Sequence, residues 1–148
     1  MRVLFLDVDG VLNNHKTLRV VQPEMDIFKI DMELVDRLKK IIKDTQCELV
    51  LSSTWRSFDG GREFLENYIG TYFLSKTDHL GGCRGDEIQA WLRVRPEVTT
   101  YAIVDDDGDM LEGQLRNFFQ TDPEYGLTDT IAYRITYHLN NGSRYIGH

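Results

Sequence analysis

The chain of 148 residues is poor in cysteine, in long apolar runs and in positive charge. Its two cysteines, Cys47 and Cys83, are too few for a disulfide framework, so we expect reduced thiols in a cytoplasmic protein. No stretch approaches the ~20 apolar residues of a membrane span. We expect that the N-terminal apolar run is not a signal peptide, because it is short and Asp7 and Asp9 interrupt it. The net charge of −7 argues against binding nucleic acid through overall charge, but leaves room for a local basic patch.

The composition that remains is that of a globular protein, with 41% hydrophobic and 11% aromatic residues. A chain of this length can bury a substantial core, and we find no repeat and no low-complexity linker. We therefore expect residues 1–148 to form a single domain.

The most informative stretch lies at residues 3–12. An almost unbroken apolar run, 3–6, indicates a strand buried on both faces, as in the middle of a parallel sheet. Asp7 would stand at the carboxyl end of this strand, where open α/β sheets place their sites. Asp9 follows two residues later, and Gly10 allows the backbone to turn sharply or approach a ligand. Because two carboxylates on a tight bend repel each other, the pattern predicts a divalent cation between them.

The rest of the chain alternates between strand and helix patterns. This alternation predicts a three-layer, Rossmann-like α/β fold with a parallel sheet of about five strands. Asp31 is a plausible cap for the helix that follows it. The expected strands are 3–6, 48–51, 72–74, 101–104 and 117–120, and the expected helices are about 32–44, 64–69, 86–95, 111–115 and 129–139.

One segment breaks the alternation. Residues 13–30 are polar and irregular and contain Pro23, and we expect a flap or a hairpin insertion there, with strands at 17–21 and 27–30. Neither this segment nor the stretch from 53 to 83 has room for a folded cap domain once the expected helices and strands are placed. We therefore expect no large cap domain and a site that is open to solvent.

Two other strand ends carry polar side chains. Ser52 follows the strand at 48–51, where a hydroxyl can hold a phosphate oxygen or simply cap a turn. The guanidinium fork of Arg56 could bind a phosphate, or Arg56 could be an ordinary surface arginine. The acidic run 105–109 follows the strand at 101–104, and it fails as a calcium loop because Met110 and Arg116 stand where such a loop needs glycine and glutamate. A metal site remains the best explanation for these carboxylates.

Taken together, these motifs resemble the haloacid dehalogenase (HAD) superfamily of phosphatases. Its first motif matches Asp7-x-Asp9, its second matches Ser52, and its fourth matches Asp105-Asp106. The third motif is usually a lysine; no lysine lies between Lys76 and Asp105, so we assign the role to Arg84, with Lys76 as the second choice. The stretches 52–56 and 84–92 also resemble a small group of HAD domains associated with nucleic-acid repair proteins.

The resemblance implies a Mg²⁺-dependent phosphatase with an aspartyl-phosphate intermediate. Asp7 would be the nucleophile, Asp9 the general acid and base, and Arg84 the cation that neutralises the transferring group. The substrate would contact Ser52, Ser53, Arg56 and Gly10, and the metal ligands would be Asp7, Asp9 through its carbonyl, Asp105 and Asp106. Asp107 and Asp109 receive no role in the chemistry.

Other functions remain as alternatives. A receiver-type signalling domain would carry its acidic pair on the first strand and a lysine near the fifth, which this chain does not. A non-catalytic HAD-like binding module would usually have lost Asp7 or Asp9. A small-metabolite phosphatase would need a partner subunit to close the open site. We expect a bulky substrate, such as a phosphorylated nucleic-acid end or a phosphoprotein, with a preference for the polynucleotide over the mononucleotide.

Overall fold

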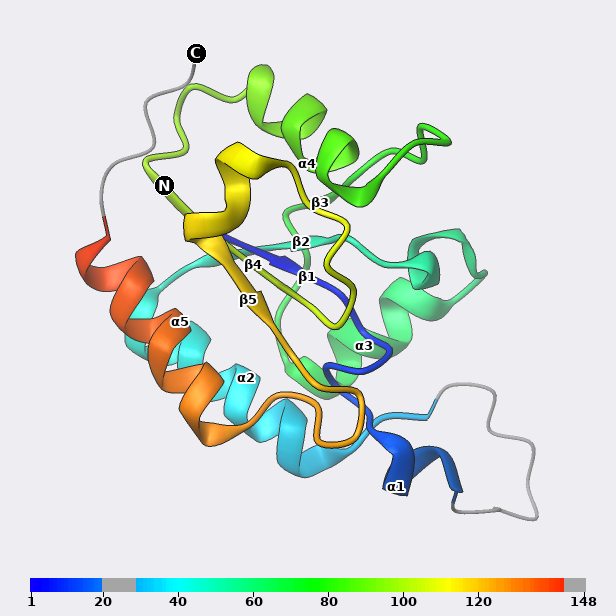
Figure 1. The fold of residues 1–148 in the computed structure, drawn as a ribbon. Helices are drawn as coiled ribbons and strands as arrows, with labels where there is room; N and C mark the ends of the chain where they lie inside the picture. The colour runs from blue at the N-terminus through cyan, green and yellow to red at the C-terminus, as the bar shows by residue number, and fades with distance from the viewer. Residues whose placement is uncertain (20–28, 143–148) are drawn as a thin grey trace.

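The protein folds around one five-stranded parallel sheet with the strand order β3-β2-β1-β4-β5. The computed structural model describes residues 1–19 and 29–142 (Figure 1). The strands are β1 (Arg2–Leu6), β2 (Glu48–Leu51), β3 (Ser75–Lys76), β4 (Thr100–Asp105) and β5 (Phe118–Gln120). The helices are α1 (His15–Arg19), α2 (Met32–Thr45), η1 (Thr54–Ser57), α3 (Gly61–Ile69), α4 (Arg84–Arg93), η2 (Glu112–Asn117) and α5 (Asp129–Asn141).

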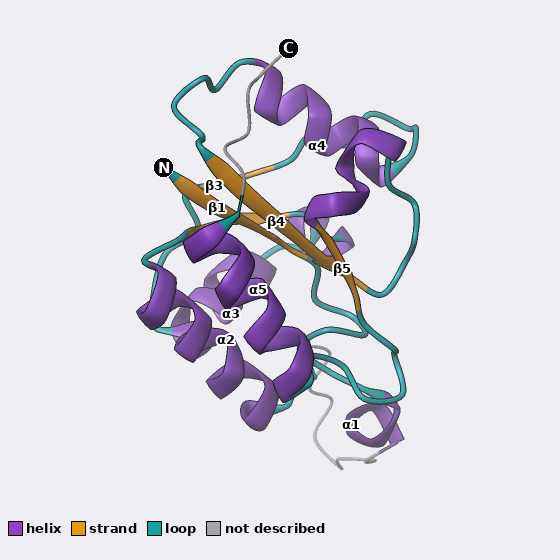
Figure 2. Cartoon of the chain, turned by 60° about the vertical axis from the view of Figure 1, so that its left-hand side comes forward, coloured by secondary structure: helices purple, strands orange, loops and turns teal. Residues whose placement is uncertain are grey.

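Helices cover both faces of the sheet, which makes three layers. Leu4 and Leu6 of β1 pack into a core with residues of α2, α3 and α5 on one face. Val3 and Phe5 point to the other face, where they meet α4. Figure 2 shows α4 on one side of the sheet and α2, α3 and α5 on the other. The predicted three-layer α/β fold with five parallel strands is therefore confirmed.

Local sequence explains the best-predicted helix. The side chain of Asp31 accepts a hydrogen bond from the backbone N–H of Glu33 and so caps the start of α2. Val35, Leu38 and Ile41 follow helical spacing and are buried in the core that packs against the sheet, and Leu34 is buried as well. The predicted cap and the apolar stripe are both confirmed.

The third strand is shorter and lies later than predicted. Residues 72–74 do not form it; the ladder with β2 consists of Ser75 and Lys76. The reason is that the backbone N–H of Phe73 donates to the side chain of Glu66 on α3, and the Phe73 ring is buried. The chain is thus held to α3 through Phe73; the backbone N–H of the next residue, Leu74, donates to the carbonyl of Leu49, and the strand itself begins at Ser75.

The segment after the first motif also differs from the expected hairpin. Residues His15–Arg19 form the helix α1 where the first strand of a hairpin was expected to begin. Residues 20–28, which include most of the expected flap, lie outside the described part of the chain. The stretch between β2 and α4 contains η1, α3 and β3 and no inserted domain.

Two smaller boundaries also shift. Helix α4 begins at Arg84, two residues before the predicted start, and the helix predicted at 111–115 is the 3₁₀ turn η2. Of the helices in the described residues, none is long and apolar enough to cross a membrane.

Candidate active site

The register of three neighbouring strands brings the first site residues to one level. Leu6 of β1 lies opposite Leu51 of β2 and Val104 of β4. The next residue in each strand is Asp7, Ser52 or Asp105. The backbone N–H of Asp7 donates to Val104, and that of Ser52 donates to Leu6, at 3.1 and 2.9 Å. The carboxyl ends of parallel strands meet at the same edge of a sheet. The pairing of the mostly apolar strands β1, β2 and β4 therefore places three polar side chains next to one another.

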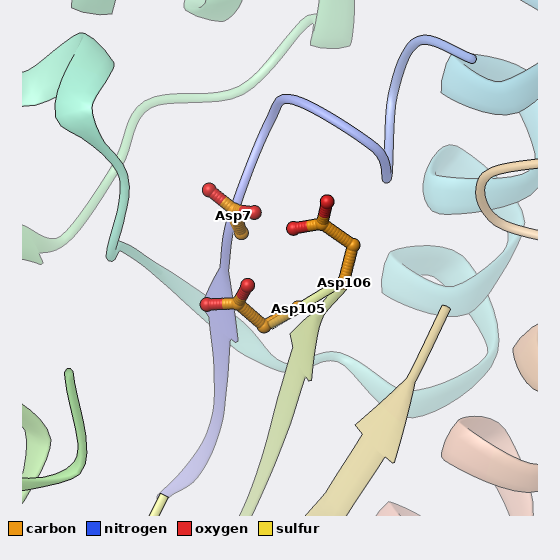
Figure 3. A group of neighbouring side chains, drawn as sticks. All are labelled: Asp7, Asp105 and Asp106. Atoms are coloured by element: carbon orange, nitrogen blue, oxygen red, sulfur yellow. The ribbon is translucent and has the colours of Figure 1, made fainter. Parts of the chain in front are cut away.

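Three carboxylates meet at this edge. Oxygen atoms of Asp7, Asp105 and Asp106 all lie within 4.8 Å of one another. Figure 3 shows the three side chains turned toward a shared space, from the end of β1 and from the end of β4. Gly10 leaves room for this cluster: it has a φ of +79°, and a Cβ there would lie 2.5 Å from Oδ2 of Asp106.

The cluster is electrostatically unfavourable without a cation. Burial, the neighbouring charge of Asp105 and a hydrogen bond to it raise the pKa of Asp7 to about 9, although Arg84 opposes the shift. Burial likewise raises the pKa of Asp105 to about 6. At neutral pH the cation-free pair therefore retains a proton, which a divalent cation with oxygen ligands would displace.

Arg84 reaches the cluster from the first turn of α4. Its Nη1 lies 3.9 Å from Oδ1 of Asp7 and 3.8 Å from Oδ2 of Asp105, and it donates to the backbone carbonyl of Ser52. Lys76 is exposed on the edge strand β3 and pairs with no described carboxylate. Of the two candidates for the third motif, the structure brings Arg84 to the carboxylates.

The two serines after β2 have different surroundings. The hydroxyl of Ser52 is buried and has no hydrogen-bond partner. Since buried polar groups are almost always paired, this oxygen is suited to a ligand. The hydroxyl of Ser53, which is expected to bind substrate, accepts from the backbone N–H of Trp55 and caps η1.

Asp9 is exposed and does not belong to the group of three carboxylates. Its Oδ1 accepts hydrogen bonds from Nδ2 of Asn13 at 2.9 Å and from Nε1 of Trp55 at 3.2 Å. Asn13 also accepts from the backbone N–H of Gly10, at 2.8 Å. These two donors hold the Asp9 side chain in place after the first strand.

The side chain of Arg56 is buried, and its guanidinium is already paired with a carboxylate. Its side chain is 6% exposed, and its Nη2 donates to both carboxylate oxygens of Glu87, each at 3.1 Å. Its Nη1 donates to Thr77. Glu87 is 4% exposed and also lies 3.9 Å from Nε of Arg84. The surface alternative for Arg56 is therefore wrong, because the guanidinium is buried in an ion pair.

Sequence reasoning missed four residues that support the site. Asn13 and Trp55 hold Asp9, and Glu87 links Arg56 to Arg84. Asp109 accepts from the backbone N–H of Arg84, which anchors the start of α4. Trp55 and Glu87 stand within the stretches that carry the motifs and Asn13 directly follows one, but nothing in their spacing reveals the partner that each contacts.

Comparison with known proteins agrees with this geometry. The family model described as the HAD domain in Swiss Army Knife RNA repair proteins matches residues 3–132. No curated protein and no solved structure gives a significant match. The matched range includes all the site residues described above and extends from β1 into α5. The chain therefore belongs to the family of HAD domains found in Swiss Army Knife RNA repair proteins.

Proposed function

We propose that the protein is a Mg²⁺-dependent phosphatase that removes a terminal phosphate from a nucleic-acid end. Membership of the HAD superfamily supports a phosphatase-like hydrolase. The observation that carries the proposal is the carboxylate cluster of Asp7, Asp105 and Asp106, with Arg84 beside it. A nucleophile, a cation site and a fixed positive charge are the groups that phosphoryl transfer requires.

The residues present suit a magnesium ion. Mg²⁺ prefers oxygen ligands, and Asp7, Asp105 and Asp106 offer carboxylates within a single cluster. The raised pKa of Asp7 points the same way, because a cation would relieve the repulsion that favours the protonated form. The backbone carbonyl of Asp9 remains a further proposed ligand. When bound, the ion would screen the approach of an anionic phosphate to an anionic carboxylate.

The chain's own residues account for the other steps of the proposed reaction. A carboxylate oxygen of Asp7 forms a bond to phosphorus as the bond to the leaving oxygen breaks, and Asp9 gives that oxygen a proton. Asp9 then takes a proton from the water that attacks the aspartyl-phosphate, which releases phosphate and restores Asp7. Arg84 neutralises charge on the transferring group, and the unpartnered hydroxyl of Ser52 donates to one of its oxygens.

Two observations favour a bulky substrate. The described residues include no cap domain over the carboxylates, and Asp9 is exposed. An open site has few groups with which to surround a small molecule, but it admits a polymer end. The family description places related domains in RNA repair proteins, which favours a nucleic-acid end over a phosphoprotein.

The test is phosphate release with matched substrates. Oligonucleotides phosphorylated at the 3′ or the 5′ end are compared with the corresponding mononucleotides, with Mg²⁺ and with EDTA. We expect Mg²⁺-dependent release and a higher kcat/KM for one of the oligonucleotides. Release that EDTA leaves unchanged would contradict the metal assignment, and a preference for the mononucleotide would contradict the substrate assignment.

A further inference from the structure

A cavity of about 620 Å³ lies beside the candidate active site, along the exposed edge of the sheet. Residues of β3 and α4 line it, and Arg62 of α3 adds to its wall. Glu87, which pairs with Arg56 and lies 3.9 Å from Arg84, stands at the end nearest the site. From Glu87 to Val94 the cavity follows α4 for roughly 10 Å, at 1.5 Å per residue. We call this cavity the edge groove.

The edge groove is richer in positive charge than the rest of this acidic chain. It contains three cationic side chains, Arg62, Lys76 and Arg95, against the carboxylates of Asp78 and Glu87. The charge of Glu87 is balanced by its buried ion pair with Arg56, and that of Arg62 by Glu66 at 3.6 Å, which leaves Lys76 and Arg95 against Asp78. Since the whole chain has a net charge of −7, this local excess of positive charge runs against the average. The edge groove is therefore a local basic patch of the kind that the overall composition does not exclude.

Arg95 is held in an orientation suited to a flat ligand. Its guanidinium carbon lies 4.0 Å from the centre of the Trp91 ring, and its Nη1 donates to the Trp91 carbonyl. Trp91 is itself fixed, because its Nε1 donates to the hydroxyl of Ser75 at 3.1 Å. A guanidinium plane held in this way can stack on a nucleobase as well as pair with a phosphate.

Lys76 is the candidate cation for the third motif that does not contact the carboxylates of the candidate active site. Its side chain makes no hydrogen bond or ion pair with a described residue, and it is exposed at the mouth of the edge groove. Two exposed apolar side chains, Leu74 and Val94, lie in the same groove. Cations interleaved with apolar and aromatic groups are the combination that binds single-stranded nucleic acid, through phosphates and base faces together.

We infer that the edge groove binds the single strand that leads away from the terminal phosphate. The inference rests on the proposed function for the position of the phosphate, and it adds the path of the chain behind it. Lys76 contacts a backbone phosphate, and Arg95 stacks on a base one or more nucleotides from the end. The strand therefore leaves the site past Glu87 and follows α4 along the edge of the sheet.

The test measures binding without catalysis, by fluorescence anisotropy with a labelled 12-nucleotide single-stranded RNA that has no terminal phosphate. We expect Lys76→Ala and Arg95→Ala each to weaken binding by about 5-fold or more, and Lys76→Ala, which loses a phosphate contact, also to reduce the salt dependence by about one counterion. Lys76→Arg keeps the charge and should bind as the parent does. The matched control is Lys40→Ala, which removes an exposed lysine from α2 on the opposite face of the sheet and should change nothing.

Three results would overturn the inference. These are no binding by the parent at low salt, equal weakening by Lys76→Ala and Lys40→Ala, and displacement of the RNA by polyglutamate of equal charge as readily as by unlabelled RNA. The third would mean that the groove recognises charge without bases. If the groove variants weaken binding while the parent releases no phosphate from any substrate, the groove stands and the proposed phosphatase function fails.

Discussion

Nε1 of Trp55 donates a hydrogen bond to Oδ1 of Asp9 across 3.2 Å, and so ties the first motif to the segment after β2. Oδ1 also accepts from Asn13, so both donors converge on the same oxygen. The proton that Asp9 would transfer must therefore be carried by Oδ2. The proposed acid and base is thus oriented by a buried indole and an amide, although the aspartate itself is exposed.

The orientation of Asp9 can be tested with two variants. Asp9→Asn should lower kcat on a phosphorylated oligonucleotide by about 10²–10⁴-fold, the usual contribution of general acid–base catalysis. Trp55→Phe removes the indole N–H together with part of the buried ring, and should lower kcat by a smaller factor, with the concentration of Mg²⁺ at half-maximal rate unchanged. If Asp9→Asn lost Mg²⁺ affinity but kept full turnover at saturating metal, the proposed role of its side chain would be wrong.

Arg84 and Lys76 are predicted to differ sharply in their effect on chemistry. Arg84→Ala should nearly abolish hydrolysis of an aryl phosphate, because Nη1 lies within 3.9 Å of both Asp7 and Asp105. Arg84→Lys should retain some activity, since a positive charge remains although the guanidinium fork is lost. Phosphate-release rates provide the comparison, and a larger loss in Lys76→Ala than in Arg84→Ala would move the third motif to Lys76.

Glu87 is predicted to matter for stability because its partner is buried with it. Glu87→Gln keeps the shape but leaves Arg56 without its counter-charge, and breaking a buried ion pair costs about 3–5 kcal/mol. Urea unfolding should show a loss of this order. Glu33→Gln is the matched control: its ion pair with Arg37 is exposed on the Glu33 side, so the loss should be under about 1 kcal/mol. Equal losses in the two variants would contradict the account of the Arg56–Glu87 pair.

The raised pKa of Asp7 predicts how stability depends on pH without metal. The folded protein holds the Asp7 proton up to about pH 9, whereas the unfolded chain releases it near 3.8. The contribution of Asp7 to the free energy of unfolding is therefore full below pH 3.8 and is lost as the pH rises toward 9. Asp7→Asn abolishes this loss.

In EDTA, the Tm of Asp7→Asn should accordingly exceed that of the parent at pH 8, by roughly 3 °C or more. The difference should shrink at pH 5, where less of the loss has occurred. Thermal unfolding at the two pH values measures it. Saturating Mg²⁺ at pH 8 should raise the Tm of the parent more than that of the variant. A difference between variant and parent that is independent of pH would contradict the proposed proton on the carboxylate pair.

Sequence patterns predicted the fold where burial alone determines it. The apolar runs at 3–6 and 48–51 match β1 and β2 because strands buried on both faces leave a continuous signal. Strand β3 has only two residues, and an edge strand of that length leaves almost no pattern. Its displacement depends on the hydrogen bond from Phe73 to Glu66, a contact that no local sequence rule predicts.

Some contacts of the candidate site could likewise be predicted from the sequence, and others could not. Asp7, Ser52 and Asp105 could be predicted to lie together because each follows a strand of the same parallel sheet. The burial of Arg56 against Glu87 could not, since the two residues stand 31 positions apart and each resembles a surface residue by type. Pairing of this kind depends on how the fold brings the side chain of Arg56 on η1 to that of Glu87 on α4, which only the folded chain shows.

The measurement that tests the central claim most directly is transfer of a labelled phosphoryl group to Asp7. The parent and Asp7→Asn are mixed with a ³²P-end-labelled oligonucleotide and Mg²⁺, quenched in acid within a single turnover, and assayed for protein-bound label and released phosphate. We predict transient acid-stable label on the parent, none on Asp7→Asn, and a fall in phosphate release of several orders of magnitude. Phosphate release by Asp7→Asn at the rate of the parent would contradict the assignment of Asp7 as the nucleophile.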